Sequence, residues 1–93
     1  MNKFQSLKIL ENNGDSVINF KGGGAVVATT DFSTPYIRSK RFTKLPREKN
    51  TILVWDWSGD SFKAIDVATI KNIKPLSDIL RNVTDGEERH KSW

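Results

Sequence analysis

The chain contains no cysteine and only one histidine, His90, among its 93 residues. Without thiols it cannot form a disulfide framework, a thiolate metal site or a cysteine nucleophile. A single imidazole also excludes a two-histidine metal site. No apolar run reaches the length of a secretory signal core or of a membrane-spanning helix. We therefore expect a cytoplasmic protein that contacts no membrane and carries neither a metal nor another cofactor.

Groups suited to catalysis are scarce as well. An enzyme site needs titratable side chains that converge, and His90 stands in a charged stretch where burial is not expected. The three carboxylates Asp56, Asp60 and Asp66 lack the spacing and the flanking glutamate of a calcium-binding loop. The sequence therefore predicts a protein that binds a partner and catalyses no reaction.

The composition is that of an ordinary small globular domain. Hydrophobic residues make up 37% of the chain and charged residues 28%, which lies outside the range typical of disorder. A chain of this length has enough apolar surface for one core but not for two. We expect a single small β domain over residues 1–84 and a charged, flexible tail over residues 85–93.

Positive charge is concentrated in one stretch, residues 36–50, which we call the basic segment. The whole chain has a net charge of +4, whereas this segment alone has +5, so the rest carries −1. Because like charges repel one another when crowded, this concentration favours a polyanionic partner over a role in solubility alone. The segment carries one glutamate, Glu48, and six cationic side chains: Arg38, Lys40, Arg41, Lys44, Arg47 and Lys49.

Short alternating or β-branched stretches, separated by turn residues, predict a mainly β fold. We expect strands over 3–9 and 17–20 joined by a turn at 11–15, and a strand over 25–30 buried on both faces. The triple glycine at 22–24 is interpreted as a flexible turn, because no lysine–serine pair and no helix follow it. Residues 31–35 predict a loop and 36–42 an edge strand. Residues 68–76 predict a turn and a last strand, followed by a short helix that begins at Ser77.

The clearest predicted element is a β-hairpin over residues 51–67. A two-residue turn at Gly59 and Asp60 would place Trp57 opposite Phe62 and Asp56 opposite Lys63. Because side chains alternate between the two faces of a strand, the hairpin has an aliphatic face and an aromatic face. The aliphatic face holds Ile52, Val54, Ile65 and Val67, and the aromatic face holds Trp55, Trp57 and Phe62.

Five to six short strands with at most one terminal helix predict a small barrel or a curled antiparallel sheet. The strand lengths, the long basic loop and the late hairpin followed by a turn and a last strand resemble SH3-like barrels. This group includes the Tudor, KOW and Sm-like domains. The resemblance concerns the layout of the chain and implies a fold, without assigning a role to any residue.

The first functional hypothesis is binding of RNA or single-stranded DNA. Aromatic rings would stack on bases while cationic side chains contact phosphates. We expect at least one of Trp55 and Trp57 to be exposed for this purpose. The candidate binding residues are Tyr36, Arg38, Lys40, Arg41, Phe42, Lys44, Arg47, Lys49, Trp55, Trp57 and Phe62.

The alternative is a protein-binding inhibitor or adaptor that recognises an acidic protein surface, since tryptophan and arginine are enriched at interface hot spots. A small cysteine-free chain rich in lysine, asparagine and isoleucine resembles accessory proteins of bacteriophages that act on host proteins. A third interpretation assigns no binding role to these residues: the tryptophans cover the core, and the lysines and arginines keep an edge strand soluble.

Overall fold

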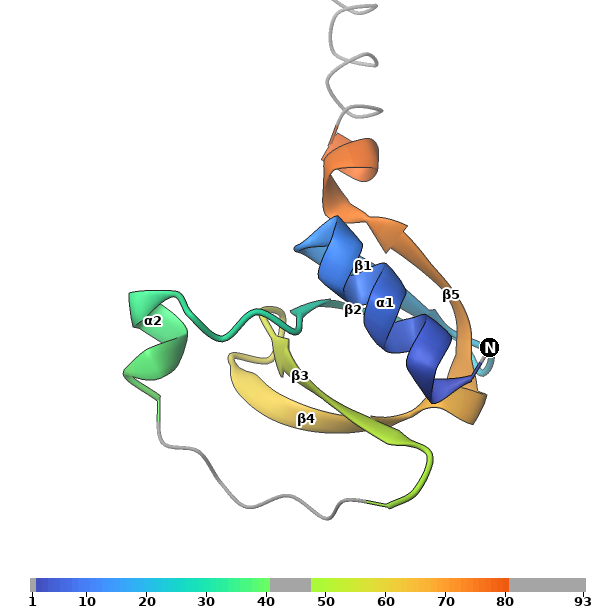
Figure 1. Cartoon of the computed structure of the whole chain (residues 1–93). Helices are drawn as coiled ribbons and strands as arrows, with labels where there is room; N and C mark the ends of the chain where they lie inside the picture. The colour runs from blue at the N-terminus through green and yellow to red at the C-terminus, as the bar shows by residue number, and fades with distance from the viewer. Residues whose placement is uncertain (1, 41–47, 81–93) are drawn as a thin grey trace, which may run out of the picture.

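The computed structural model describes residues 2–40 and 48–80. These residues form a mainly β fold in which five antiparallel strands make one sheet, in the order β4-β3-β2-β1-β5. The sheet is curled but not closed (Figure 1). Of the two expected architectures, the curled antiparallel sheet is therefore the one observed.

The elements follow one another along the chain with short connections, except between α2 and β3. The order is α1 (Lys3–Asn13), β1 (Ser16–Phe20), β2 (Ala25–Thr29), α2 (Pro35–Arg38), β3 (Thr51–Asp56), β4 (Ser61–Asp66), the 3₁₀ turn η1 (Val67–Thr69) and β5 (Ile70–Pro75). A C-terminal helix begins at Leu76 and extends to Leu80, the last described residue. The predicted last strand and terminal helix are thus confirmed.

The N-terminal segment is a helix, so the strand expected over residues 3–9 is wrong. Asn2 caps the helix: its Oδ1 accepts the Gln5 N–H at 2.8 Å, and the Gln5 side chain accepts the Asn2 N–H at 3.2 Å. This reciprocal pair is a capping box, which satisfies two N–H groups that a helix start leaves open. The helix ends at Gly14, whose φ of 71° suits glycine. The expected turn at 11–15 therefore ends a helix and does not join two strands.

Helix α1 lies across the open side of the curled sheet and closes the core (Figure 1). Leu10 is fully buried, and Leu7, one turn earlier, packs against the same cluster. Residues three or four positions apart lie on one helix face, so this spacing presents one apolar stripe to the strands. The core cluster comprises Leu10, Ile18, Ala28, Ile52, Val54, Ile65, Val67 and Ile70. The aliphatic face expected for the hairpin is thereby confirmed as core.

Strands β1 and β2 form an antiparallel pair around the triple glycine, which was expected to be a turn. The turn needs glycine because Gly23 and Gly24 have φ values of 97° and 82°. Strand β2 is exposed at Ala25, partly buried at Val26 and Val27, and fully buried only at Ala28 and Thr29. The expectation that this strand is buried on both faces holds only for its second half.

Residues 36–38 are helical, so the edge strand expected over 36–42 is wrong in the part that is described. Thr34 is the N-cap of the short helix α2, and Pro35 occupies its first turn. Proline favours this position because its φ is already helical and its missing N–H would have no partner there. Ile37 is buried, which fixes α2 against the protein. Residues 41–42 lie outside the described part of the chain.

The β3–β4 hairpin forms, but its register differs from the prediction by two residues. Trp55 pairs with Phe62, Asp56 with Ser61 and Val54 with Lys63, so the connecting loop has four residues, 57–60. A shift of two residues preserves the side of the sheet on which each side chain lies. Asp56 and Lys63 therefore remain on one face, and their charged groups meet at 2.6 Å as diagonal neighbours.

Candidate functional site

Five aromatic side chains gather on the face of the hairpin opposite the aliphatic core, and we call them the aromatic cluster. Trp55 is its centre, with edge-to-face contacts to its neighbours at centroid distances of 4.9–6.2 Å. Such contacts match the positive edge of one ring to the negative face of another. The cluster comprises Phe32, Tyr36, Trp55, Trp57 and Phe62.

The centre of the aromatic cluster is not accessible to a partner. Trp55 is only 1% exposed, while Trp57 and Phe62 are partly buried. The expectation that Trp55 or Trp57 stands exposed on the hairpin is therefore not met. The loop that carries Phe32 and α2 folds over this face of the hairpin and contributes two of the rings. A second layer of residues thus covers the aromatic face, much as α1 covers the aliphatic face.

Tyr36 is the ring of this cluster that reaches solvent, with 48% of its surface exposed. Its orientation is fixed from two sides. The ring stacks on Trp57 at a centroid distance of 6.0 Å and an interplanar angle of 23°. Its hydroxyl donates a hydrogen bond of 2.6 Å to Asp60 Oδ1 in the hairpin loop. An exposed aromatic ring held in one orientation loses little conformational entropy when it binds a flat ligand.

Lys40 completes the surroundings of Tyr36. Its Nζ lies 4.5 Å from the centroid of the Tyr36 ring and 3.5 Å from Asp60 Oδ2. The hydrogen bond from Tyr36, with help from Lys40, lowers the pKa of Asp60. The Tyr36 hydroxyl, followed by Asp60, in turn raises the pKa of Lys40. Both groups are therefore charged near neutral pH, and the lysine is held over the ring.

The hairpin loop that carries Asp60 is itself fixed where it begins. The Trp57 N–H donates to Val27 O at 2.7 Å, and the indole Nε1 donates to Asp15 Oδ1 at 2.9 Å. At the start of the loop, the Asp56 carboxylate is fully buried and meets the Lys63 ammonium. Burial alone would raise the pKa of Asp56, but Lys63 and the N–H groups of Gly59 and Ser58 lower it overall. The carboxylate is thus charged and supports the loop on which Tyr36 rests.

The basic segment is described only at its two ends. Arg38 and Lys49 are exposed, and Lys40 is partly buried beside Tyr36. Four of the predicted site residues lie outside the described residues: Arg41, Phe42, Lys44 and Arg47. The structure therefore brings Lys40 over the ring of Tyr36, which stacks on Trp57 and contacts the buried Trp55. Arg38 is exposed on the same short helix, with no contact to these rings among the described residues.

Sequence reasoning missed two residues that organise this site. Asp60 was assigned only to the turn, and Asp15 received no role, yet they hold Tyr36 and Trp57 respectively. The role of Asp60 could have been suspected from its position in the sequence, because it lies in a polar loop next to a strand that ends in aromatic residues. Asp66 is exposed and accepts the Ala68 N–H, so it caps η1. No local pattern pointed to Asp15, because 42 residues separate it from Trp57.

Neither a metal-binding cluster nor a membrane helix occurs within residues 2–40 and 48–80. These residues contain no group of three or more His, Cys, Asp or Glu side chains that could hold a metal ion. In the same part of the chain, no helix is both long enough and apolar enough to cross a membrane. Comparison with protein-family models, with curated proteins and with solved structures finds no match for this chain.

Proposed function

We propose that the protein binds single-stranded nucleic acid, RNA or DNA, through a site centred on Tyr36. The observation that carries the proposal is the exposed and oriented ring of Tyr36 at the start of the basic segment. Stacking of a base on an aromatic side chain tolerates any base, because every base has a π face. Cationic side chains beside the ring contact the phosphates and supply most of the affinity.

The position of Lys40 suggests how a base would be accepted. In the unbound protein the ammonium lies over the ring and is paired with Asp60. A base that stacks on this part of the ring takes the place of the ammonium. Lys40 then becomes available for the phosphate next to that base, so displacement of the lysine costs little. Arg38 is exposed on the same short helix and is available for a neighbouring phosphate.

The test is fluorescence anisotropy with labelled twelve-nucleotide oligo(U) and oligo(dT) at low salt. We expect Tyr36→Ala to weaken binding by about tenfold, because stacking contributes roughly 1–3 kcal/mol per base. Tyr36→Phe retains the ring and should stay within about twofold of the parent on the same grounds. The double variant Arg38→Ala, Lys49→Ala should reduce the slope of log affinity against log salt by about two units.

The chain offers matched controls for both changes. Phe4 on α1 is 68% exposed and has Lys8 over its ring at 5.2 Å, so it repeats the aromatic–lysine pair elsewhere on the surface. Phe4→Ala should leave nucleic-acid binding unchanged. Lys71 and Lys74 on β5 are exposed and serve as the control pair for charge. Failure of the parent to bind either oligonucleotide at low salt would refute the proposal, as would equal losses in Tyr36→Ala and Phe4→Ala.

One feature favours the protein-binding alternative. A carboxylate, Asp60, lies directly beside the exposed ring and Lys40, and alternating charges of both signs are common around an aromatic anchor in protein interfaces. A pull-down from lysate, with and without nuclease, separates the two classes. Capture of a protein that persists after nuclease treatment and changes little with salt would support an inhibitor or adaptor.

A further inference from the structure

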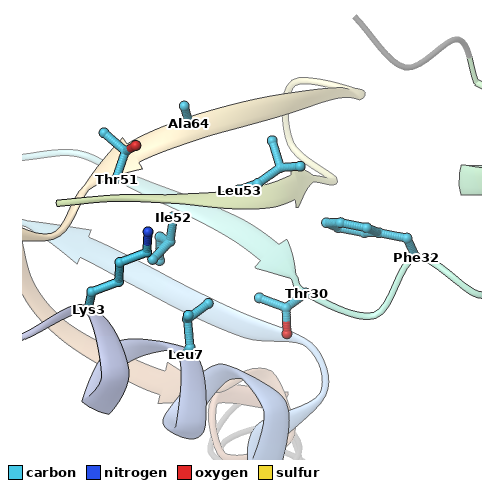
Figure 2. Close-up of a pocket in the computed structure, with 8 residues that line it drawn as sticks. All are labelled: Lys3, Leu7, Thr30, Phe32, Thr51, Ile52, Leu53 and Ala64. Carbon is cyan, nitrogen blue, oxygen red and sulfur yellow. The ribbon is translucent and has the colours of Figure 1, made fainter. Parts of the chain in front are cut away.

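A groove runs along one edge of β3, beyond the point where its pairing with β2 ends. Strand β2 pairs with β3 only at Ala28↔Asp56 and Thr29↔Trp55. The chain then leaves the sheet at Thr30, while β3 extends four residues further, to Thr51. A cavity of about 310 Å³ occupies the place where β2 would have continued (Figure 2).

The residues around this cavity show that it follows the edge of the strand and not one of its faces. Ile52 and Leu53 are consecutive in β3, so their side chains point to opposite faces of the sheet. Both nevertheless line the cavity, together with Leu7 and Lys3 from α1 below and Phe32 at one end. An opening bordered by both faces of a strand lies against its backbone.

The backbone groups of Leu53 point toward this groove. The Trp57 N–H donates to Val27 O, and hydrogen-bonding groups alternate in direction along an antiparallel strand. The N–H and C=O of Leu53, four residues earlier, therefore face the same side as those of Trp57. In the described sheet the β2–β3 ladder stops at Trp55, so no strand pairs with Leu53 on this side. Unpaired edge groups of this kind can accept an added strand.

A positive charge at one end of the groove indicates which end of an added peptide strand would lie there. Lys3 lies at the Thr51 end of the groove, and Figure 2 shows its side chain rising from α1 toward β3. No ion pair joins Lys3 to a carboxylate within the described residues, and the first turn of α1 contains no acidic residue. A peptide that continues the direction of β2 runs antiparallel to β3 and ends beside Lys3. Its terminal carboxylate would therefore meet this ammonium.

We propose that this groove binds the extended C-terminal segment of a partner protein, added as a strand against Leu53 with its free carboxylate on Lys3. The four residues Thr51–Val54 offer about 13 Å of strand edge, which accommodates a peptide of four residues. Main-chain hydrogen bonds supply affinity, and the apolar lining from Leu53 and Phe32 selects aliphatic side chains on that face of the added strand. This site uses none of the residues assigned to nucleic-acid binding, so a negative result for one proposal does not refute the other.

The experiment titrates the ¹⁵N-labelled full chain with the peptide acetyl-Thr-Val-Thr-Val, prepared with a free C-terminal carboxylate and as the amide. We expect saturable shifts at the amides of Leu53, Thr30 and Lys3, with the amidated peptide binding about fivefold more weakly. Lys3→Gln should abolish the difference between the two peptides. Lys8→Gln lies on the exposed face of the same helix and should preserve it. N-methylation of the two valines should abolish binding, because it removes main-chain donors.

Three outcomes would overturn the proposal. One is the absence of saturable shifts at Leu53 up to about 5 mM peptide, which corresponds to negligible affinity. A second is equal binding of the acid and the amide to the parent protein. The third is a response of the same amides to protein concentration without peptide, because it would assign the groove to a second copy of this chain.

Discussion

The two faces of the β3–β4 hairpin are buried by different means. The aliphatic face packs against α1 and the other strands, and its residues Ile52, Val54 and Ile65 join a single apolar core. The aromatic face is covered by its own loop and by the chain around α2, with Trp55 at 1% exposure. Apolar burial is non-directional, whereas the aromatic face depends on ring geometry and on hydrogen bonds at its margin.

The comparison shows why the candidate site lies on the aromatic face. Packing between aliphatic side chains leaves few polar groups at the surface. The aromatic face instead ends in Tyr36 and Trp57, whose polar atoms bond Asp60 and Asp15. The protein thereby presents a ring to solvent in a fixed orientation, while Trp55 at the centre of the cluster remains buried.

The largest effect is expected from truncation on the aliphatic face. Ile52→Ala should lower the free energy of unfolding by about 3 kcal/mol, because it leaves a cavity in a closely packed core. Leu53 is the next residue but is only partly buried on the other side. Leu53→Ala should cost about 1 kcal/mol by the area it loses. Urea unfolding followed by circular dichroism measures both, and equal losses would contradict the assignment of the two faces.

The hairpin loop should tolerate no side chain at Gly59. A Cβ there would stand 2.7 Å from Asp56 Oδ2 and 3.2 Å from Lys63 Nζ, so the ion pair between the buried Asp56 and the half-exposed Lys63 would have to move. We expect Gly59→Ala to lower the free energy of unfolding by about 2 kcal/mol. Gly22 is the control, since a Cβ added there would meet nothing within 4 Å and its φ is not positive. Gly22→Ala should change stability by less than about 0.5 kcal/mol.

Asp56 should make stability depend on pH in the acid range. Its pKa in the folded protein is lowered from the ordinary value of 3.8. Its contribution is therefore complete above that value and is lost as the pH falls through the lower folded value. Asp56→Asn should cost about 1.5 kcal/mol at pH 7, since it breaks the contact with Lys63. Thermal unfolding between pH 2 and about 7 should show the gap between parent and variant closing below about pH 4.

The control for this measurement is Asp78→Asn, because Asp78 is exposed on the C-terminal helix. That variant should follow the parent over the whole range. Asp60 and Asp31 also have lowered pKa values and remain in both variants, so some loss of stability in acid persists. A gap between parent and Asp56→Asn that stays constant down to pH 2 would show that the carboxylate is not stabilised as a charged group.

The smallest effect is expected at the centre of the aromatic face. Trp55 Nε1 is buried and has no hydrogen-bond partner among the described residues. A buried donor without a partner destabilises the folded protein by about 1–3 kcal/mol. Replacing Trp55 with Phe removes this donor, which offsets part of the packing energy that is lost with the larger ring. Trp55→Phe should therefore lower the free energy of unfolding by no more than about 1 kcal/mol. Chemical unfolding followed by circular dichroism provides the measurement, and a loss above about 3 kcal/mol would contradict this account.

Alternation along the hairpin sufficed to assign its faces but not its register. The pairs predicted from a two-residue turn satisfied charge and ring matching, yet the true loop has four residues. A shift of two residues leaves each side chain on its predicted face of the sheet, so the face pattern does not distinguish the two registers. The decision therefore depended on contacts outside the hairpin: Trp57 leaves the strand pair because its N–H bonds Val27 and its indole bonds Asp15.

At the N-terminal helix the error was of a different kind, because the type of element itself was predicted wrongly. Its apolar residues fit an interrupted alternation almost as well as a helical stripe, and the deciding signal was the capping pair of Asn2 and Gln5. In the same way, Thr34 and Pro35 indicate the start of α2 more strongly than the residues after them indicate a strand. Both helices could have been found from their caps, because capping uses neighbours in sequence.

Composition and side-chain periodicity were enough to establish the fold class, the division of the hairpin into an aliphatic and an aromatic face, the glycine turn and the concentration of positive charge. These features depend on composition and on the period of side chains along the chain, which are local properties. Only the tertiary structure shows that Trp55 is buried, that Tyr36 carries the exposed ring and that β2 stops pairing with β3 after Thr29. Each of these depends on where a distant segment, α2, the hairpin loop or α1, comes to lie. Such placements follow from packing and hydrogen bonds between residues far apart in the chain, which no local pattern records.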